Sequence, residues 1–170
     1  MDNKSINRPK IPAYILPGLS GRYIARLALV ALARYLIFSY VLIPVRIQGG
    51  SMEPAYKDGG YNLIWRPAYT FSGPGRFDVV GVRLAGEKVM LLKRVIALEG
   101  EVVEFRKGKL FVNGREIDEP YMGYKYDWTL APRKVEKGKV YVAGDNRNMP
   151  MKNHSFGQTP LKRIVGVPLW

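Results

Sequence analysis

The feature that most constrains this chain is a long apolar run near its N-terminus. From Leu27 to Val45 the sequence reads LALVALARYLIFSYVLIPV, in which Arg34 is the only charged residue. A helix over residues 23–43 would be roughly 30 Å long at ~1.5 Å per residue, which is the thickness of one hydrocarbon core. An arginine near the middle of a span costs at least ~2.5 kcal/mol on insertion scales, and the surrounding aliphatic side chains can offset that cost. We therefore predict a transmembrane helix over residues 23–43.

Two other interpretations of the apolar run remain open, a cleaved signal peptide and a buried or interfacial helix. The signal peptide is the weaker one, because its apolar region is normally shorter and Arg34 interrupts this run. The preceding residues 1–22 are polar and basic, and their prolines discourage a helix. By the positive-inside rule, residues 1–22 form a cytoplasmic tail and residues 44–170 an outward-facing domain. In a bacterium this places the protein in the cytoplasmic (inner) membrane.

The charge and composition exclude several functions. The whole chain has a net charge of +13, and residues 46–170 contain 21 Lys and Arg against 13 Asp and Glu. Because this charge is scattered rather than clustered on a helix, an anionic phospholipid surface is the expected partner and nucleic acid is not. The absence of cysteine rules out thiol catalysis and disulfides. The single histidine, His154, argues against a histidine-rich metal site, so we expect no metal or cofactor.

The part after the span has the pattern of a β protein. Short runs rich in β-branched or aromatic residues alternate with Gly, Pro and Asn. Asn113-Gly114 lies between two such runs and predicts a type I′ hairpin turn. The fold is therefore expected to be mainly β, preceded by one N-terminal transmembrane α-helix. The predicted strand segments are IPVRIQG, YNLIW, FDVVGVRL, KVMLLKRVIAL, EVVEFRKG, KLFVNGREI and GKVYVAGD.

A candidate nucleophile follows the span. Ser51 lies in GGSMEP, residues 49–54, where two glycines before the serine and a proline after it favour a fixed turn. The segment differs from the G-x-S-x-G elbow of hydrolases, because Glu53 occupies the last position. An ordinary loop is the other interpretation, so a catalytic role for Ser51 requires a base elsewhere in the chain.

Lys93 is the candidate base. It lies within the apolar run VMLLKRVIAL, and in an alternating strand Leu91 shares its face while Arg94 points the other way. Either the amine reaches solvent, or it is buried and its pKa falls until the neutral amine can accept a proton. A serine paired with a neutral lysine is a known variant of the catalytic triad and needs no histidine.

Five segments in a fixed order then connect the chain to a known family. They are IQGGSMEP, GRFDVVGVR, LLKRVIALEGEVVE, KLFVNGREIDEPYM, and GDNR followed by FG and IVGVPLW. With these segments behind an apolar span that contains an arginine, residues 25–170 resemble the bacterial type I signal peptidases. These are membrane-anchored serine proteases of the Ser/Lys-dyad class. The resemblance implies a β-rich signal-peptidase-like catalytic domain that cleaves the signal peptides of exported preproteins.

The resemblance also implies residue roles. Ser51 would be the nucleophile, its backbone N–H an oxyanion donor, and Lys93 the general base. Arg94 and Asp145 would support the lysine strand, as an ordinary ion pair would also do. The residues implied for binding small substrate side chains, which could equally be plain core, are Ile47, Met52, Tyr56, Leu91 and Leu92.

The chain departs from the family pattern in places. Gly49 stands where some members have a serine that supplies a second oxyanion donor, and Phe77 replaces a glycine. In the last segment the family reads G-D-N-R-x-x-S-x-D-S-R, whereas Pro150, Lys152 and His154 replace its serine, aspartate and arginine. We expect a backbone carbonyl within residues 149–151 to bind the Lys93 amine, and His154 to be a surface or packing residue.

The alternatives to a general signal peptidase are therefore two. One is a specialised pilus or conjugation maturation protease of the same class. The other is an inactive membrane-anchored binding module, which only the altered last segment favours.

Overall fold

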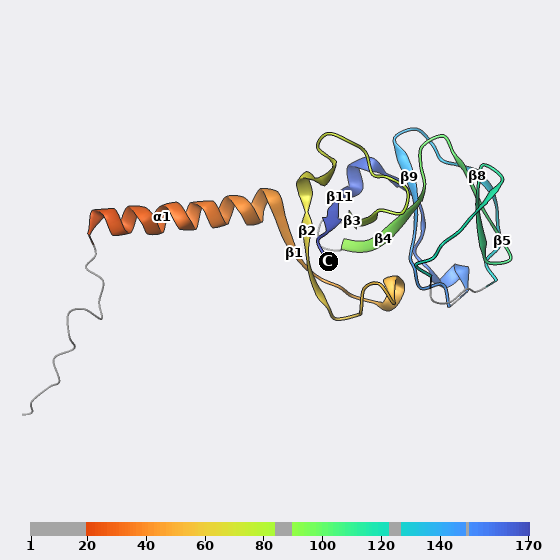
Figure 1. Cartoon of the computed structure of the whole chain (residues 1–170), viewed down its shortest axis with the longest axis horizontal. Helices are drawn as coiled ribbons and strands as arrows, with labels where there is room; N and C mark the ends of the chain where they lie inside the picture. The colour runs from red at the N-terminus through yellow and green to blue at the C-terminus, as the bar shows by residue number, and fades with distance from the viewer. Residues whose placement is uncertain (1–19, 84–89, 123–126, 149) are drawn as a thin grey trace, which may run out of the picture. The chain divides into compact units, whose positions relative to one another are not determined.

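The computed structural model describes residues 20–83, 90–122, 127–148 and 150–170 (Figure 1). Its N-terminal helix consists of α1, Gly21–Leu36, and a π-helical turn, Ile37–Val41. The helix begins where Ser20 Oγ accepts the N–H of Tyr23 at 3.3 Å. It ends close to Pro44, whose ring disfavours helical backbone in the residue before it.

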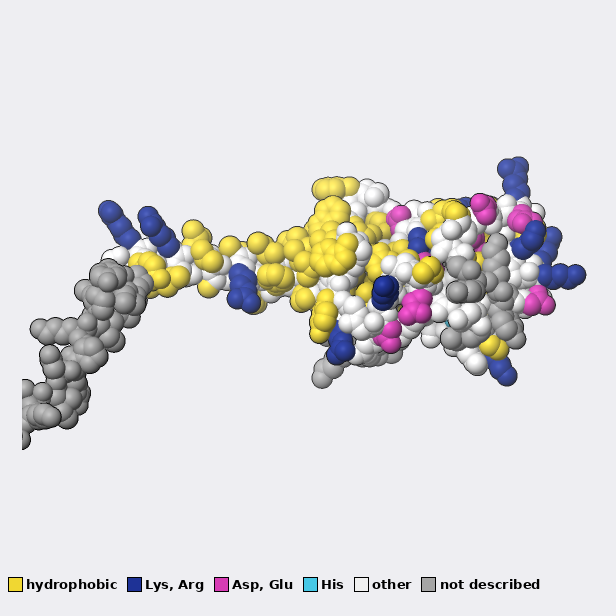
Figure 2. All heavy atoms as spheres, turned by 60° about the horizontal axis from the view of Figure 1, so that its bottom comes forward, with side chains coloured by type: hydrophobic (Ala, Val, Ile, Leu, Met, Phe, Trp, Pro, Cys, Tyr) yellow, Lys and Arg dark blue, Asp and Glu magenta, His cyan; other side chains and the backbone are white. Residues whose placement is uncertain are grey.

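The helical segment Gly21–Val41 has a mean hydropathy of 1.7 and is long enough to cross a membrane. Figure 2 shows hydrophobic side chains covering most of it. The predicted span, residues 23–43, overlaps this helix but is displaced by two residues, because residues 42 and 43 belong to the first strand. Of the predicted tail, residues 1–19 lie outside the described residues. The chain divides into two compact units, one ending at Ile37 and the other running from Phe38 to Trp170.

The second unit is built from strands joined by short 3₁₀ turns. The strands are β1 Leu42–Arg46, β2 Tyr61–Trp65, β3 Val79–Arg83, β4 Met90–Ala97, β5 Val102–Arg106, β6 Lys109–Val112, β7 Arg115–Ile117, β8 Leu130–Lys134, β9 Lys139–Ala143, β10 Gly157–Pro160 and β11 Ile164–Pro168. The 3₁₀ turns are Gly50–Met52, Arg66–Tyr69, Met151–Asn153 and Leu161–Arg163.

These strands form two antiparallel sheets. The larger sheet has the order β1-β2-β11-β3-β4-β9-β10, and the smaller has the order β7-β6-β5-β8. In Figure 1, β5 and β8 lie on one side of β9, and β1, β2 and β11 lie on the other. The prediction of a mainly β fold is confirmed.

The hairpin expected at Asn113-Gly114 is present. These two residues join β6 to β7 with φ values of 51° and 75°, and Val112 pairs with Arg115. A second two-residue turn, Lys107-Gly108, joins β5 to β6 with φ values of 47° and 76°. Positive φ at both central positions is the requirement of a type I′ turn, which Asn-Gly meets at the lowest steric cost.

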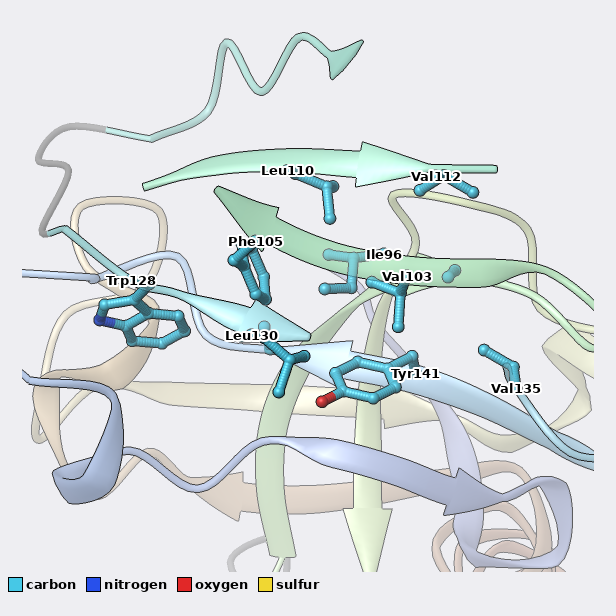
Figure 3. Close-up of a cluster of buried hydrophobic side chains, with 11 residues drawn as sticks. Ile96, Val103, Phe105, Leu110, Val112, Trp128, Leu130, Val135 and Tyr141 are labelled. Atoms are coloured by element: carbon cyan, nitrogen blue, oxygen red, sulfur yellow. The ribbon is translucent and has the colours of Figure 1, made fainter. Parts of the chain in front are cut away.

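The largest core cluster fills the space between the two sheets. Figure 3 shows apolar side chains of the four-stranded sheet facing Ile96 of β4 and Tyr141 of β9. Phe105 and Trp128 contact each other edge to face within this cluster, with ring centroids 5.6 Å apart. The cluster therefore fixes β4, which carries Lys93, against β9, which leads into the GDNR segment.

Three strands were not among the predicted segments. β8, β10 and β11 read LAPRK, GQTP and IVGVP, so each contains a proline and two contain a glycine. β8 and β10 are edge strands, where a proline removes no required ladder hydrogen bond. Their assignment depends on pairing with a neighbouring strand, which a local sequence pattern does not report.

Candidate active site

Ser51 and Lys93 meet, although they are far apart in the sequence. Ser51 lies in the 3₁₀ turn Gly50–Met52, between β1 and β2, and Lys93 lies at the middle of β4. The Nζ of Lys93 is 2.9 Å from the Oγ of Ser51. Lys93 is only 3 % exposed, and its strand lies between β3 and β9 in the larger sheet.

The surroundings of Lys93 favour its neutral form. Burial lowers the pKa of its amine from 10.5 to about 8, and the nearby carboxylate of Asp145 partly opposes the shift. An amine with this pKa is half neutral near pH 8, whereas an ordinary lysine there is almost entirely protonated. The pair therefore has the geometry and the electrostatics of a nucleophile with its general base.

A narrow cavity opens beside Ser51. Four of the five residues expected to bind substrate, Ile47, Met52, Leu91 and Leu92, line it together with Ser51. Its volume of about 20 Å³ is room for one water-sized group. Met52 is almost completely buried, and Ile47 and Leu92 are more than nine-tenths buried. Three of its walls are therefore buried side chains, and its volume fits only a small side chain.

The fifth residue, Tyr56, is not part of that wall. It packs against the cluster of buried residues that contains Ile47, Met52 and Leu92. Its N–H donates to the carbonyl of Met52 at 3.0 Å. The structure thus places Tyr56 behind the cavity, where it supports the turn that carries Ser51.

Arg94 and Asp145 form the expected ion pair. Arg94 donates to both carboxylate oxygens of Asp145, at 2.8 Å and 2.6 Å, and Asp145 is completely buried. Arg94 also donates to the carbonyl of Phe77 at 2.7 Å and lies 4.0 Å above the ring of Tyr121. The guanidinium therefore joins β4 to the GDNR segment and to the segment that contains Phe77.

Phe77, the residue that departs from the glycine of the family pattern quoted above, has left-handed backbone. Its φ is 73°, a conformation that a side chain makes costly. Its ring contacts Tyr121 edge to face with centroids 5.6 Å apart, and its N–H donates to the carbonyl of Val95 at 2.7 Å. The backbone at position 77 therefore has the conformation that favours glycine, and these contacts hold the phenylalanine in it.

The GDNR segment contacts the Ser51 turn directly. Asn146 donates its backbone N–H to the carbonyl of Ser51 at 3.0 Å and its side-chain Nδ2 to the carbonyl of Gly50 at 2.9 Å. A Cβ on Gly144 would lie only 2.3 Å from the Ser51 carbonyl oxygen, so no side chain fits there. Asn146 was part of the quoted motif, but its role was not predicted.

Glu119 and Arg147 form a second buried ion pair that sequence reasoning missed. Their side chains are each 2 % exposed and make two hydrogen bonds, of 2.8 Å and 2.6 Å. Tyr121 donates its hydroxyl to Glu119 at 2.6 Å. Both charged residues lay within quoted motifs, but each has another charged residue close by in the sequence, so no local signal singled them out.

The altered last segment contains a contact that was not predicted. His154 is buried, in keeping with a packing residue, but it also lies 2.7 Å from the carbonyl of Asn146. The carbonyls of Pro150 and Met151 accept the N–H groups of Asn153 and His154. Within the described residues the Lys93 amine donates to Ser51 Oγ, and its contact with a backbone carbonyl stays a prediction. Met149, the remaining residue of that prediction, lies outside the described residues.

Gly49 has no side chain and so cannot supply the second oxyanion donor that a serine provides in some family members. Gly49 has φ 87°, and its N–H donates to Oδ1 of Asp58 at 2.8 Å. Among the residues that the structure describes, no group of three His, Cys, Asp or Glu residues could hold a metal ion.

Comparisons with known proteins identify the family to which the chain is similar. The family described as signal peptidase, peptidase S26, matches the chain over residues 20–169. Signal peptidase I V of Bacillus subtilis is 34 % identical over 141 residues, which cover 75 % of this chain and 83 % of that protein. Signal peptidase IB of Staphylococcus aureus is 30 % identical over 162 residues, covering 85 % of this chain and 84 % of that protein. A solved signal peptidase I from Enterococcus faecalis, 26 % identical, covers 56 % of this chain and 97 % of its own, with a TM-score of 0.47.

The family match extends over the Ser51 turn, the Lys93 strand and the GDNR segment. The chain belongs to the signal peptidase I family, peptidase S26, and is a serine endopeptidase that removes signal peptides.

Proposed function

We propose that Ser51 is the nucleophile and Lys93 the general base with which this signal peptidase hydrolyses one peptide bond of a preprotein. The observation that carries the proposal is the 2.9 Å contact between Lys93 Nζ and Ser51 Oγ at a site where the lysine is 3 % exposed. Burial lowers the pKa of the amine to about 8. A lysine with its ordinary pKa would be almost entirely protonated at neutral pH and could not act as a base.

The reaction then proceeds in two halves. The neutral Lys93 amine takes the hydroxyl proton as Ser51 Oγ attacks the scissile carbonyl, and the resulting ammonium gives that proton to the leaving amine. The mature protein departs with a free N-terminus, and the signal peptide stays attached to Ser51 as an ester. The same amine next deprotonates a water, which hydrolyses the ester and regenerates Ser51.

The oxyanion is assigned to backbone N–H groups at the Ser51 turn. In a 3₁₀ turn the first N–H groups have no partner within the turn, and that of Ser51 is one of them. A backbone donor needs no particular side chain, which accommodates the glycine at position 49.

The proposed substrate is an extended segment with a small side chain before the cleaved bond. The cavity formed by Ile47, Met52, Leu91 and Leu92 holds about 20 Å³, enough for a methyl group. β1 is an edge strand of the larger sheet, so its outer backbone groups can pair with an added strand. Tyr56 contributes to this site from behind, by supporting Met52.

The proposed location is a membrane, with the N-terminus in the cytoplasm. The chain has one N-terminal apolar helix, which is consistent with the membrane anchoring of a signal peptidase. The excess of basic residues before that helix favours a cytoplasmic tail over residues 1–22 and an outward-facing catalytic domain over residues 44–170. In a bacterium the proposed membrane is the cytoplasmic one, with its phospholipid surface as a partner.

The test is cleavage of a purified preprotein by the full chain in detergent. Ser51→Ala and Lys93→Ala should each slow cleavage about a thousandfold or more, because the two groups act as one unit. Lys93→Arg should be equally inactive, since a guanidinium keeps its proton. Lys109→Ala and Ser72→Ala, which change exposed residues of the same types, should leave the rate unchanged. Substantial turnover by either dyad alanine variant would remove the assignment.

A further inference from the structure

The only histidine of the chain lies close to the nucleophile turn. His154 is 8 % exposed, and its ring contacts Trp128 with centroids 5.0 Å apart. It follows the 3₁₀ turn Met151–Asn153 and therefore comes from a segment that contains neither Ser51 nor Lys93. The established activity of the family does not explain a buried histidine at this place.

A chain of hydrogen bonds runs from His154 to the Ser51 turn. His154 Nε2 is 2.7 Å from the carbonyl oxygen of Asn146, and because a carbonyl only accepts, Nε2 carries the proton. Asn146 in turn donates its N–H to the carbonyl of Ser51 and its Nδ2 to that of Gly50. Asn146 thus holds both residues of the turn, and His154 holds the Asn146 backbone.

The packing around Gly144 is close enough to exclude a side chain at that position. A Cβ on Gly144 would lie 2.5 Å from Cε1 of His154 and 2.3 Å from the carbonyl oxygen of Ser51. The imidazole ring and the carbonyl of Ser51 therefore both pack against the side of Gly144 where a side chain would stand. The ring and the Ser51 turn are thus connected through the GDNR segment, by these contacts and by the hydrogen bonds of Asn146.

The imidazole remains neutral while it does this. Burial lowers the pKa of His154; the hydrogen bond to Asn146 opposes the shift, and the nearby cations Lys93 and Arg147 add to it. A neutral ring with its proton on Nε2 supplies the donor without placing a further positive charge beside Lys93.

We propose that His154 is a positioning residue that holds Ser51 at its distance from Lys93 by donating Nε2–H to the carbonyl of Asn146. This inference rests on the proposed function, in which Ser51 attacks and Lys93 is the base. Catalysis is sensitive to the placement of the nucleophile, and an error of about 1 Å can cost on the order of a hundredfold in rate. Substrate binding uses other residues, so the effect of losing the donor falls on kcat rather than on KM.

The test compares two amides of different reach. In His154→Gln the side-chain NH₂ extends to about the position of Nε2, whereas in His154→Asn it stops near the position of Nδ1. Kinetics of preprotein cleavage by the full chain in detergent should give a Gln variant within about threefold of wild-type kcat. The Asn variant should lose about tenfold in kcat with KM changed less than twofold, which corresponds to one hydrogen bond of about 1.4 kcal/mol. Lys152→Ala, a neighbouring exposed position, should match wild type.

Other outcomes distinguish failure of the roles proposed for Ser51 and Lys93 from failure of the positioning role proposed for His154. Equal kcat for the Gln and Asn variants, or a change confined to KM, would overturn the positioning role. A loss that follows only the melting temperature of the variants would likewise assign His154 to packing alone. If Ser51→Ala remains active in the same assay, the proposed function fails. If Ser51→Ala is inactive and His154→Asn has wild-type kcat, only the inference about His154 fails.

Discussion

At Lys93 the requirements of folding and of the proposed chemistry conflict. A buried ammonium is costly, and its neighbours in β3 and β4, Val80, Leu92 and Arg94, carry no carboxylate. The cost appears as the lowered pKa, about 8 in place of 10.5. The same burial that weakens the folded state therefore makes the amine a base at near-neutral pH.

The pH dependence of cleavage follows from this pKa. Because only the neutral amine accepts the Ser51 proton, kcat/KM should rise with pH through about 8 and then level off. The measurement is kcat/KM on a preprotein between about pH 6 and pH 10. A rising limb at the pKa of free lysine, about 10.4, would mean that the amine is solvated.

The free energy of unfolding should change in the same pH window. The pKa of Lys93 is lower in the folded chain than in the unfolded one, so between about pH 8 and 10.5 the unfolded chain binds the additional proton. Stability from this group therefore rises with pH across that window and is lowest below it.

Phe77 permits a second prediction at the scale of one residue. With φ at 73°, an alanine keeps the backbone strain and loses the ring, whereas a glycine loses the ring and removes the strain. Phe77→Gly should therefore unfold with a free energy about 1 kcal/mol higher than Phe77→Ala. The control is Phe111 in strand β6, where the alanine variant should be the more stable of the pair. Denaturant unfolding of all four variants measures these free energies. An alanine variant more stable than the glycine variant at Phe77 would contradict the prediction.

At the scale of elements, the site depends on segments that follow strands rather than on the strands alone. Glu119 follows β7 and Arg147 follows β9, and their buried ion pair joins the smaller sheet to the GDNR segment. Arg147 also lies 4.9 Å from the ring centroid of Phe105 in the core between the sheets. The segment that contacts Ser51 is therefore anchored by a charge in the interior.

Breaking this pair should be costly. Glu119→Gln leaves the Arg147 charge buried without its partner, and we expect a loss of about 3–5 kcal/mol in the free energy of unfolding. The same substitution at Glu116, whose pair with Lys109 has side chains 51 % and 55 % exposed, should cost below about 1 kcal/mol. Denaturant unfolding measures both values. Equal losses at the two positions would show that the buried pair does not anchor the segment.

For the whole molecule, the proposed orientation depends on one helix and on the basic residues that precede it. A phosphatase that is active only outside the cytoplasm should be active when fused after Trp170 and inactive when fused before Tyr23. Replacing Arg22 and Arg26 with Glu should increase the fraction of inverted molecules, whereas Arg83→Glu, far from the helix in sequence, should not. Activity of the N-terminal fusion alone would reverse the proposed topology.

Local patterns in the sequence were sufficient for several conclusions. The apolar run predicted a helix that the structure places at Gly21–Val41, and Asn113-Gly114 predicted its turn because few residues tolerate positive φ. The motif order also pointed to the signal peptidase family, and membership in that family sets the inactive binding module aside. These conclusions were available because each depends on residues that are neighbours in the chain.

Only the tertiary structure brought distant residues together. The contact between Ser51 and Lys93 joins residues 42 positions apart, and the sequence offered them as candidates without their distance. The role of Asn146, the burial of His154 and the ion pair of Glu119 with Arg147 depend on how β4, β9 and the smaller sheet pack. Such contacts are decided by strand pairing and close packing across the whole chain, and no short stretch of sequence contains that information.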